Sequence, residues 1–413
     1  MKISSFLKER ESRIKPDEAR KMNLKRIVRI TQNGEIFISD KNSNTDMILV
    51  KPGDLVISGI GIAKGGGNSL NIYEGKEDVL TTIHYSSYII NENIVLKEFL
   101  KILLISSYFR KLLQENSPNG IKAEIKAKHI LPIEINIPSI EIQKQIINKI
   151  NGVKNEIEEV EEIQDMNKNN LKKLRQQILQ EAVQGKLVSQ DPKDEPASEL
   201  LKKIKAGKEK LIKEGKIKKQ KPLLPISKDE IPYELPKGWE WERLQKICNS
   251  LSAGGDKPSD FVKEKTKEKS IPVIANGETN KGIIGYTKEA KIFEKSITVS
   301  GRGTIGYSCI RDFSYNPIVR LIVLIPNKNI DIKFLQYAIS ARLETGLGTS
   351  IPQLTVPMIS PRLIPIPPLQ EQKRIVEKVD KLMTYCDELE KQVKENKINS
   401  EKLMEAVLKE SFR

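Results

Sequence analysis

The sequence has 413 residues, of which 38% are hydrophobic and 30% charged, which predicts a soluble chain of two or three globular domains. No apolar run reaches the roughly 18 residues of a membrane-spanning helix, and the N-terminal MKISSFLKER has no apolar signal core. Cys248, Cys309 and Cys386 are too widely spaced for a disulfide framework or a zinc site, which favours a reducing cytoplasm.

The formal net charge of +15 is typical of nucleic-acid-binding proteins, because lysine and arginine neutralise phosphates and release counterions. A general abundance of lysine would give the same charge. Residues 201–221 carry ten lysines against Glu209 and Glu214, so eight of the fifteen net charges lie there. A charge run of this kind favours a solvated helix or linker over a base-reading surface.

Two stretches of mixed α/β character are predicted, over 1–136 and 236–365. In the first, strand-like GEIFIS, MILV and DLVISGIGIAK precede a helical VLKEFLKILLISSYFRKLL. In the second, strand-like IPVIANG, SITVSGRGTIGYSCI and IVRLIVLIP precede a helical IKFLQYAISARLE. Both stretches therefore follow the same order of elements.

An internal repeat organises the chain. IPSIEIQKQIINKI (137–150) and IPPLQEQKRIVEKV (366–379) align without gaps at an offset of 229 residues, with six of fourteen positions identical. Gln143 and Gln372 are one identical pair. Self-similarity over so long a period predicts a tandem duplication in which a globular part is followed by a helix.

Both helical segments, 137–184 and 366–413, carry apolar residues at a spacing of 3.5, which demands a partner helix. We expect them to pair as an antiparallel coiled coil that joins the globular parts with pseudo-twofold symmetry. Asn167 and Asn396 interrupt the pattern at equivalent places. A linker over 185–235 contains a short basic helix. The predicted seam residues are Ile146, Ile150, Val153, Ile157, Leu171, Leu174, Ile375, Val379, Leu382, Leu389 and Leu403.

A glycine pattern in VSGRGTIGY (299–307) matches the G-x-G-x-x-G of dinucleotide-binding enzymes. That site needs a helix after the glycines, whereas YSCIRDFSYNPIVRLIVLIP continues as strand. Ser58 and Gly59 of VISGIGIAK match Ser300 and Gly301. The pattern therefore predicts a tight β-turn repeated in both halves, with the glycines serving backbone geometry.

Residues that would indicate catalysis are scarce. The two histidines, His84 and His129, are isolated, and the sequence contains no phosphate-binding loop, metal-ligand spacing or nucleophile elbow. NPIV at 316–319 lacks the second proline and the aromatic residue of an adenine methyltransferase motif. We therefore expect no catalytic centre, metal or cofactor in this chain.

The chain resembles the DNA-specificity subunits of type I restriction-modification enzymes over essentially its whole length. The resemblance lies in LPKGWEWERL, GDLVISG, ITVSGRGTIG, GTSIPQL and DEPASELLKKIK, and in the Pro-Pro-Leu-x-Glu-Gln segment before a heptad helix. It implies two target-recognition domains (1–136 and 236–365), each reading half of a split, asymmetric site in double-stranded DNA. The two helices would set the spacing of the half-sites.

The resemblance also implies the partners. Two modification subunits would dock on the helices and methylate adenines with S-adenosylmethionine, and a restriction subunit would use ATP and Mg. Polar, glycine-rich loops supply the side chains expected to read bases. The predicted DNA-binding residues are Lys64, Asn68, Asn119, Lys122, Asn276, Lys281, Arg302, Ser350 and Gln353. The alternatives are the same module in another restriction or methylation system, a coiled-coil scaffold, and a nucleotide-dependent enzyme.

Overall fold

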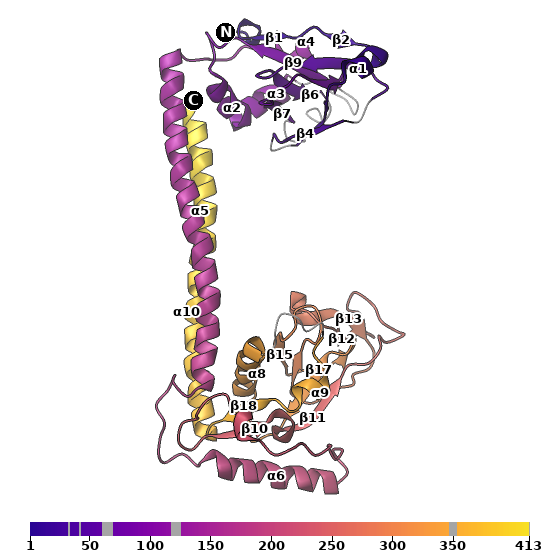
Figure 1. Cartoon of the computed structure of the whole chain (residues 1–413), viewed down its shortest axis with the longest axis vertical. Coiled ribbons are helices and arrows are strands. Elements are labelled where there is room, and N and C mark those ends of the chain that lie inside the picture. The colour runs from indigo at the N-terminus through magenta and orange to yellow at the C-terminus, as the bar shows by residue number, and fades with distance from the viewer. Residues whose placement is uncertain (32–33, 41–42, 60–68, 117–124, 347–352, 413) are drawn as a thin grey trace. The chain divides into compact units, whose positions relative to one another are not determined.

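The structure, a computed structural model, describes residues 1–413 except 32–33, 41–42, 60–68, 117–124, 347–352 and 413. The chain forms two units. Unit 1 is Met1–Asp165 with Val393–Arg413, and unit 2 is Met166–Gln392. Each unit has its own apolar core and mixed α/β composition (Figure 1), which confirms the predicted fold class.

Unit 1 contains two sheets. The four-stranded sheet has the order β1-β9-β6-β7 and is antiparallel throughout. The five-stranded sheet has the order β2-β5-β8-β3-β4, with β3 and β8 parallel. The strands are β1 (Leu7–Glu9), β2 (Arg13–Ile14), β3 (Arg26–Ile30), β4 (Ile36–Ser39), β5 (Met47–Val50), β6 (Leu55–Ser58), β7 (Leu70–Ile72), β8 (Val79–Thr82) and β9 (Tyr85–Ile90). Besides the long helices α5 (Ile140–Val183) and α10 (Leu369–Ser411), the helices are α1 (Pro16–Met22), α2 (Lys97–Ile105), α3 (Ser107–Glu115) and α4 (Ala127–Ile130).

Unit 2 contains three sheets, β11-β17-β14-β15, β13-β12-β16 and β10-β18. The strands are β10 (Glu240–Arg243), β11 (Cys248–Ala253), β12 (Ile271–Ile274), β13 (Ile283–Thr287), β14 (Ser296–Val299), β15 (Ser308–Arg311), β16 (Asn316–Pro317), β17 (Ile322–Pro326) and β18 (Leu363–Ile366). The helices other than α5 and α10 are α6 (Ala197–Lys213), α7 (Leu244–Ile247), α8 (Ile332–Gly346) and α9 (Val356–Ile359).

The duplication read from the sequence is present in the topology. The sheets β1-β9-β6-β7 and β11-β17-β14-β15 have the same strand order, and each contains the hairpin that follows the repeated Ser-Gly. The short helices α4 and α9 begin at Ala127 and Val356, the same 229 residues apart as the aligned repeat segments. The two copies thus share one arrangement of strands and helices.

The long helices predicted over 137–184 and 366–413 are α5 (Ile140–Val183) and α10 (Leu369–Ser411). In unit 1 the beginning of α5 pairs with the end of α10, where Lys149 Nζ lies 2.9 Å from Glu410 Oε2. In unit 2 the end of α5 pairs with the beginning of α10, where Arg175 Nη2 donates to Asp387 Oδ1 at 2.6 Å. The two helices therefore run antiparallel, as predicted.

Part of the predicted seam is wrong. Ile150, Ile375 and Val379 are buried, and the half-buried members are Ile146, Val153, Ile157, Leu171 and Leu382. Leu174, Leu389 and Leu403, however, are 44%, 46% and 48% exposed. The buried residues Ile150, Gln164 and Ile178 of α5, and Val379, Cys386 and Val407 of α10, recur at multiples of seven residues. One position of the predicted heptad therefore stays buried along both helices, while the other position becomes exposed towards Leu174, Leu389 and Leu403.

The basic linker contains a helix that is docked, not free. On α6 the ammonium of Lys208 donates to the carbonyls of Gln245 (2.8 Å) and Cys248 (2.7 Å) and to Gln220 Oε1 (2.9 Å). Burial lowers the pKa of Lys208. One lysine of the charge run thus satisfies the carbonyls at the end of α7 and holds α6 against unit 2.

Candidate nucleic-acid interface

Three loops of unit 2 meet where β12, β14 and β16 end. They are residues 275–282, 300–307 and 318–321, and together with 353–354 we call them the loop cluster. Ile318 N donates to Ile274 O at 2.9 Å, and Gly277 N donates to Ser300 Oγ at 3.0 Å. The cluster carries Lys281, Arg302 and Arg320 against the single carboxylate of Glu278. Its net charge suits a polyanion.

The middle loop contains the glycine pattern and joins β14 to β15 as a hairpin. Ser300 N donates to Tyr307 O at 2.9 Å. Gly303 and Gly306 have φ of 69° and 89°, values that residues with a side chain rarely adopt. A Cβ on Gly301 would lie 2.5 Å from the carbonyl oxygen of Leu354. For unit 2 the interpretation as a tight turn is confirmed, since a strand follows the glycines where a dinucleotide site needs a helix, whereas the equivalent loop of the first half lies outside the described residues.

The same backbone hydrogen bond to a glycine occurs in both units. In unit 2, Leu354 N donates to Gly301 O at 2.8 Å, and in unit 1, Ile125 N donates to Gly59 O at 3.1 Å. Ile125 and Leu354 are again 229 residues apart. Both glycines follow a serine at the end of a central strand: Ser58 is the last residue of β6, and Ser300 comes directly after β14. In each unit the chain on its way to the long helix therefore donates a backbone hydrogen bond to the glycine that follows the central strand.

Asn276, predicted to read DNA, holds two loops together. Its Oδ1 accepts from Gly301 N at 2.8 Å, and its Nδ2 donates to Val319 O at 2.7 Å. Because each end of the amide is already bonded, the side chain positions the cluster. The prediction that it contacts DNA remains a prediction.

Two other predicted residues lie side by side. Arg302 Nη2 donates to Gln353 Oε1 at 2.9 Å, and both side chains line a cavity of about 150 Å³ together with Arg320. Lys281 lies in the neighbouring loop, exposed, with its carbonyl accepting from Arg311 Nη2 at 2.6 Å. Arg311 is buried and also donates to Thr298 Oγ1, so it props this loop on β14. Lys64, Asn68, Asn119, Lys122 and Ser350 lie outside the described residues.

Sequence reasoning missed Val319 and Arg320. IVRLIVLIP was predicted as one strand, but residues 318–321 form a turn and β17 begins only at Ile322. β-Branched residues favour strands, so nothing in the local sequence indicates a turn there. Both residues are exposed.

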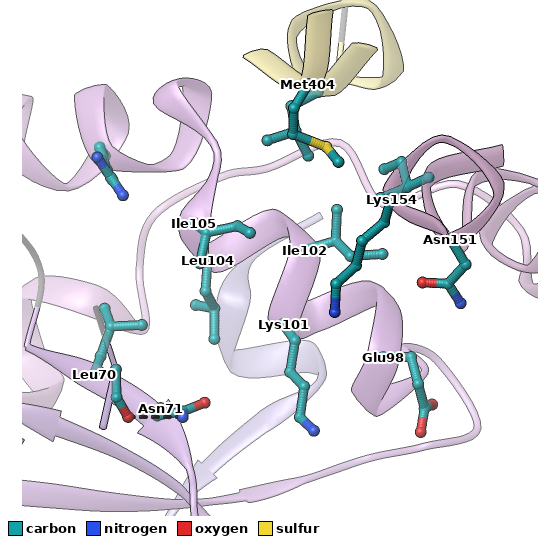
Figure 2. Close-up of a pocket in the computed structure, with 14 residues that line it drawn as sticks. Leu70, Asn71, Glu98, Lys101, Ile102, Leu104, Ile105, Asn151, Lys154 and Met404 are labelled. Carbon is teal, nitrogen blue, oxygen red and sulfur yellow. Dashed lines mark hydrogen bonds between the residues drawn. The ribbon is translucent and has the colours of Figure 1, made fainter. Parts of the chain in front are cut away.

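Unit 1 contains a hollow of about 610 Å³ whose lining includes residues of α2, α5 and α10. Figure 2 shows Ile102 and Ile105 on one side and Met404 on another. Of its polar residues, Lys101 is paired with Glu74, and Asn71 Nδ2 donates to Gly34 O at 2.8 Å. Those two groups are therefore already paired within the fold.

Within the described residues, no three His, Cys, Asp or Glu side chains gather as metal ligands would. His129 Nδ1 accepts from Lys126 N at 3.1 Å and so closes the first turn of α4. Over the same residues no helix combines the length and the apolarity that crossing a membrane requires.

The fold defines a chain of two related globular parts, each followed by a long helix, and unit 2 presents a basic loop cluster. Comparison with known proteins agrees. The model of the "Type I restriction modification DNA specificity domain" matches residues 236–400. The specificity subunit of the type I restriction enzyme EcoAI from Escherichia coli is 39% identical over 254 residues, covering 54% of this chain and 41% of that subunit.

A second relative is a putative type I specificity subunit, S.MpnORF289P C-terminus, from Mycoplasma pneumoniae. It is 41% identical over 104 residues, which cover 25% of this chain and 72% of the relative. A solved structure described as "Structural basis underlying complex assembly and conformational transition of the type I R-M system" shares the fold, with a TM-score of 0.66, 16% identity and coverage of 100% and 97%. The chain belongs to the family of type I restriction-modification specificity subunits. It spans about two fifths of the length of the EcoAI subunit.

Proposed function

We propose that this chain is the sequence-specific DNA-binding subunit of a type I restriction-modification complex. Each globular part reads one half of a bipartite, asymmetric site in double-stranded DNA. The observation that carries this proposal is a backbone hydrogen bond that both units make before the long helix, from Ile125 N to Gly59 O and from Leu354 N to Gly301 O. Two copies of one recognition plan suit two half-sites, and the basic loop cluster of unit 2 suits a phosphate backbone.

The helices α5 and α10 serve in this proposal as the docking surface for two modification subunits. Apolar side chains that stay exposed on a charged helix mark an interaction surface. On these helices they include Val160, Ile163, Met166, Leu174, Leu389, Ile398 and Leu403. S-adenosylmethionine, ATP and Mg then belong to the modification subunits and to a restriction subunit, and this chain performs no chemistry of its own.

Two measurements on the full chain test the DNA-binding role. A titration of random duplex DNA at several salt concentrations should give a log K that falls linearly with log salt. Selection from a random duplex pool should enrich two short motifs separated by a fixed gap. A binding constant that does not change with salt contradicts DNA binding, and a single continuous motif contradicts two half-site readers.

A further inference from the structure

The turn at Val319 and Arg320 is held in a backbone conformation that these residues disfavour. Both lie in the left-handed region, with φ of 52° and 59°, and Leu321 N donates to Ile318 O at 3.1 Å to close the turn. Asn-Gly is the usual choice for two consecutive left-handed residues, and a β-branched residue there is an outlier. If the turn served only the fold, Asn-Gly would form it with less strain than Val319 and Arg320 do.

Three hydrogen bonds from neighbouring segments, two with backbone carbonyls and one from a side chain, fix this turn. Val319 N donates to Gly255 O at 2.8 Å, Arg320 N donates to Gly254 O at 3.0 Å, and Asn276 Nδ2 donates to Val319 O. Gly254 has to be glycine, because a Cβ there would lie 2.6 Å from Ile318 N. The strained conformation is therefore over-determined, which is characteristic of functional sites.

This rigid turn presents an apolar and a cationic side chain together at the surface. Val319 is 47% exposed. Arg320 is exposed and lines the cavity of about 150 Å³ that Arg302 and Gln353 also line. A β-branched methyl pair beside a guanidinium matches two features of the major groove, the thymine methyl group and the paired acceptors of guanine.

We propose that Val319 and Arg320 form a base-reading element of unit 2, in which Val319 contacts a thymine methyl group and Arg320 the guanine edge of a nearby base pair. The inference rests on the proposed DNA-binding function and deepens it. Asn276 is then a positioning residue, since it holds the turn through the carbonyl of Val319.

The decisive variant is Val319→Asn with Arg320→Gly in the full chain. It installs the sequence that prefers this turn, so its midpoint of thermal unfolding should equal or exceed that of the wild type. In selection from a random duplex pool it should lose the preference at one or two base pairs, roughly tenfold or more at the guanine. The other positions of the motif should be retained.

Two single variants support the interpretation. Arg320→Gln should relax the guanine position alone, whereas Lys267→Gln, which removes an equal charge from an exposed site outside the loop cluster, should leave the motif intact. An unchanged motif in the Val319→Asn, Arg320→Gly variant overturns the proposal. So does an equal loss of affinity for all sequences, which would indicate phosphate contact only. A wild-type chain that enriches no motif instead overturns the proposed function, and this inference with it.

Discussion

Gln143 and Gln372 occupy equivalent positions of the repeat and make equivalent hydrogen bonds. Each is fully buried. Gln143 Oε1 accepts from Leu96 N at 2.8 Å, and Gln372 Oε1 accepts from Asp331 N at 2.9 Å, in each case the residue that caps α2 or α8. Each Nε2 donates to the carbonyl of the proline five residues earlier. One side chain per unit therefore fixes the long helix to the helix of the globular part.

Replacing either glutamine by leucine should destabilise its unit. The change leaves a buried backbone N–H and a proline carbonyl without partners, which costs about 1–3 kcal/mol per group. Urea unfolding of Gln372→Leu should show this loss in the free energy of unfolding. Gln177→Leu on the exposed side of α5 is the matched control and should change it by less than about 0.5 kcal/mol. Equal effects of the two variants would contradict the role given to Gln372.

Gly301 and Gly303 should differ in their tolerance of alanine. At Gly301 the new Cβ meets the Leu354 carbonyl oxygen at 2.5 Å, whereas at Gly303 no atom lies within 4 Å and only the positive φ of 69° opposes it. Gly303→Ala should cost about 1 kcal/mol, and Gly301→Ala more, with loss of the hydrogen bond from Leu354 N. Thermal unfolding of both variants decides it, and a costlier Gly303→Ala would refute the close contact.

The corrected seam leads to opposite expectations for two residues of α10. Val407 is 9% exposed and packs against Ile102 and Ile150, whereas Leu403 is 48% exposed. Val407→Asp should destabilise unit 1 by several kcal/mol, because it buries an unpaired carboxylate. Leu403→Asp should stay within about 0.5 kcal/mol of the wild type. Chemical denaturation measures both free energies of unfolding. A large loss of stability for Leu403→Asp would show that Leu403 is buried between the helices, as the sequence predicted.

Glu371 provides a pH test. It is 1% exposed, and burial raises its pKa although Trp239 Nε1 donates to its Oε2 at 3.0 Å. A carboxyl whose pKa is raised by folding stabilises the fold below its ordinary pKa and loses that contribution as pH rises through the folded value.

Glu371→Gln keeps an oxygen for the Trp239 bond and removes the buried charge. The variant should therefore match the wild type near pH 4 and be the more stable of the two at pH 8. Thermal unfolding of both proteins at several pH values between 4 and 8 measures how their difference in stability changes. An advantage of the variant that grows towards acid would show that the carboxylate is stabilised by its surroundings and that the direction is wrong.

Much of the architecture could be predicted because it repeats. The offset of 229 residues and the apolar spacing of two segments sufficed to predict α5, α10 and the duplicated hairpin. Which of the two heptad positions stays buried could not be predicted, because Leu174 and Leu403 fit the apolar spacing as well as the buried Ile178 and Val407 do. The role of Asn276 could not be predicted either, because its two hydrogen-bond partners lie 25 and 43 residues away in the chain. Val319 and Arg320 were missed because their propensity favours the strand that tertiary contacts override.

The pairing of β10 with β18 closes the second globular part. Glu240 lies opposite Ile366, so the chain leaves this part beside the place where it enters. In unit 1, Lys2 bridges Glu134 in the same way. Each globular part is therefore tied at its own ends, so a change of length or sequence in the loops between them leaves the start of the long helix in place.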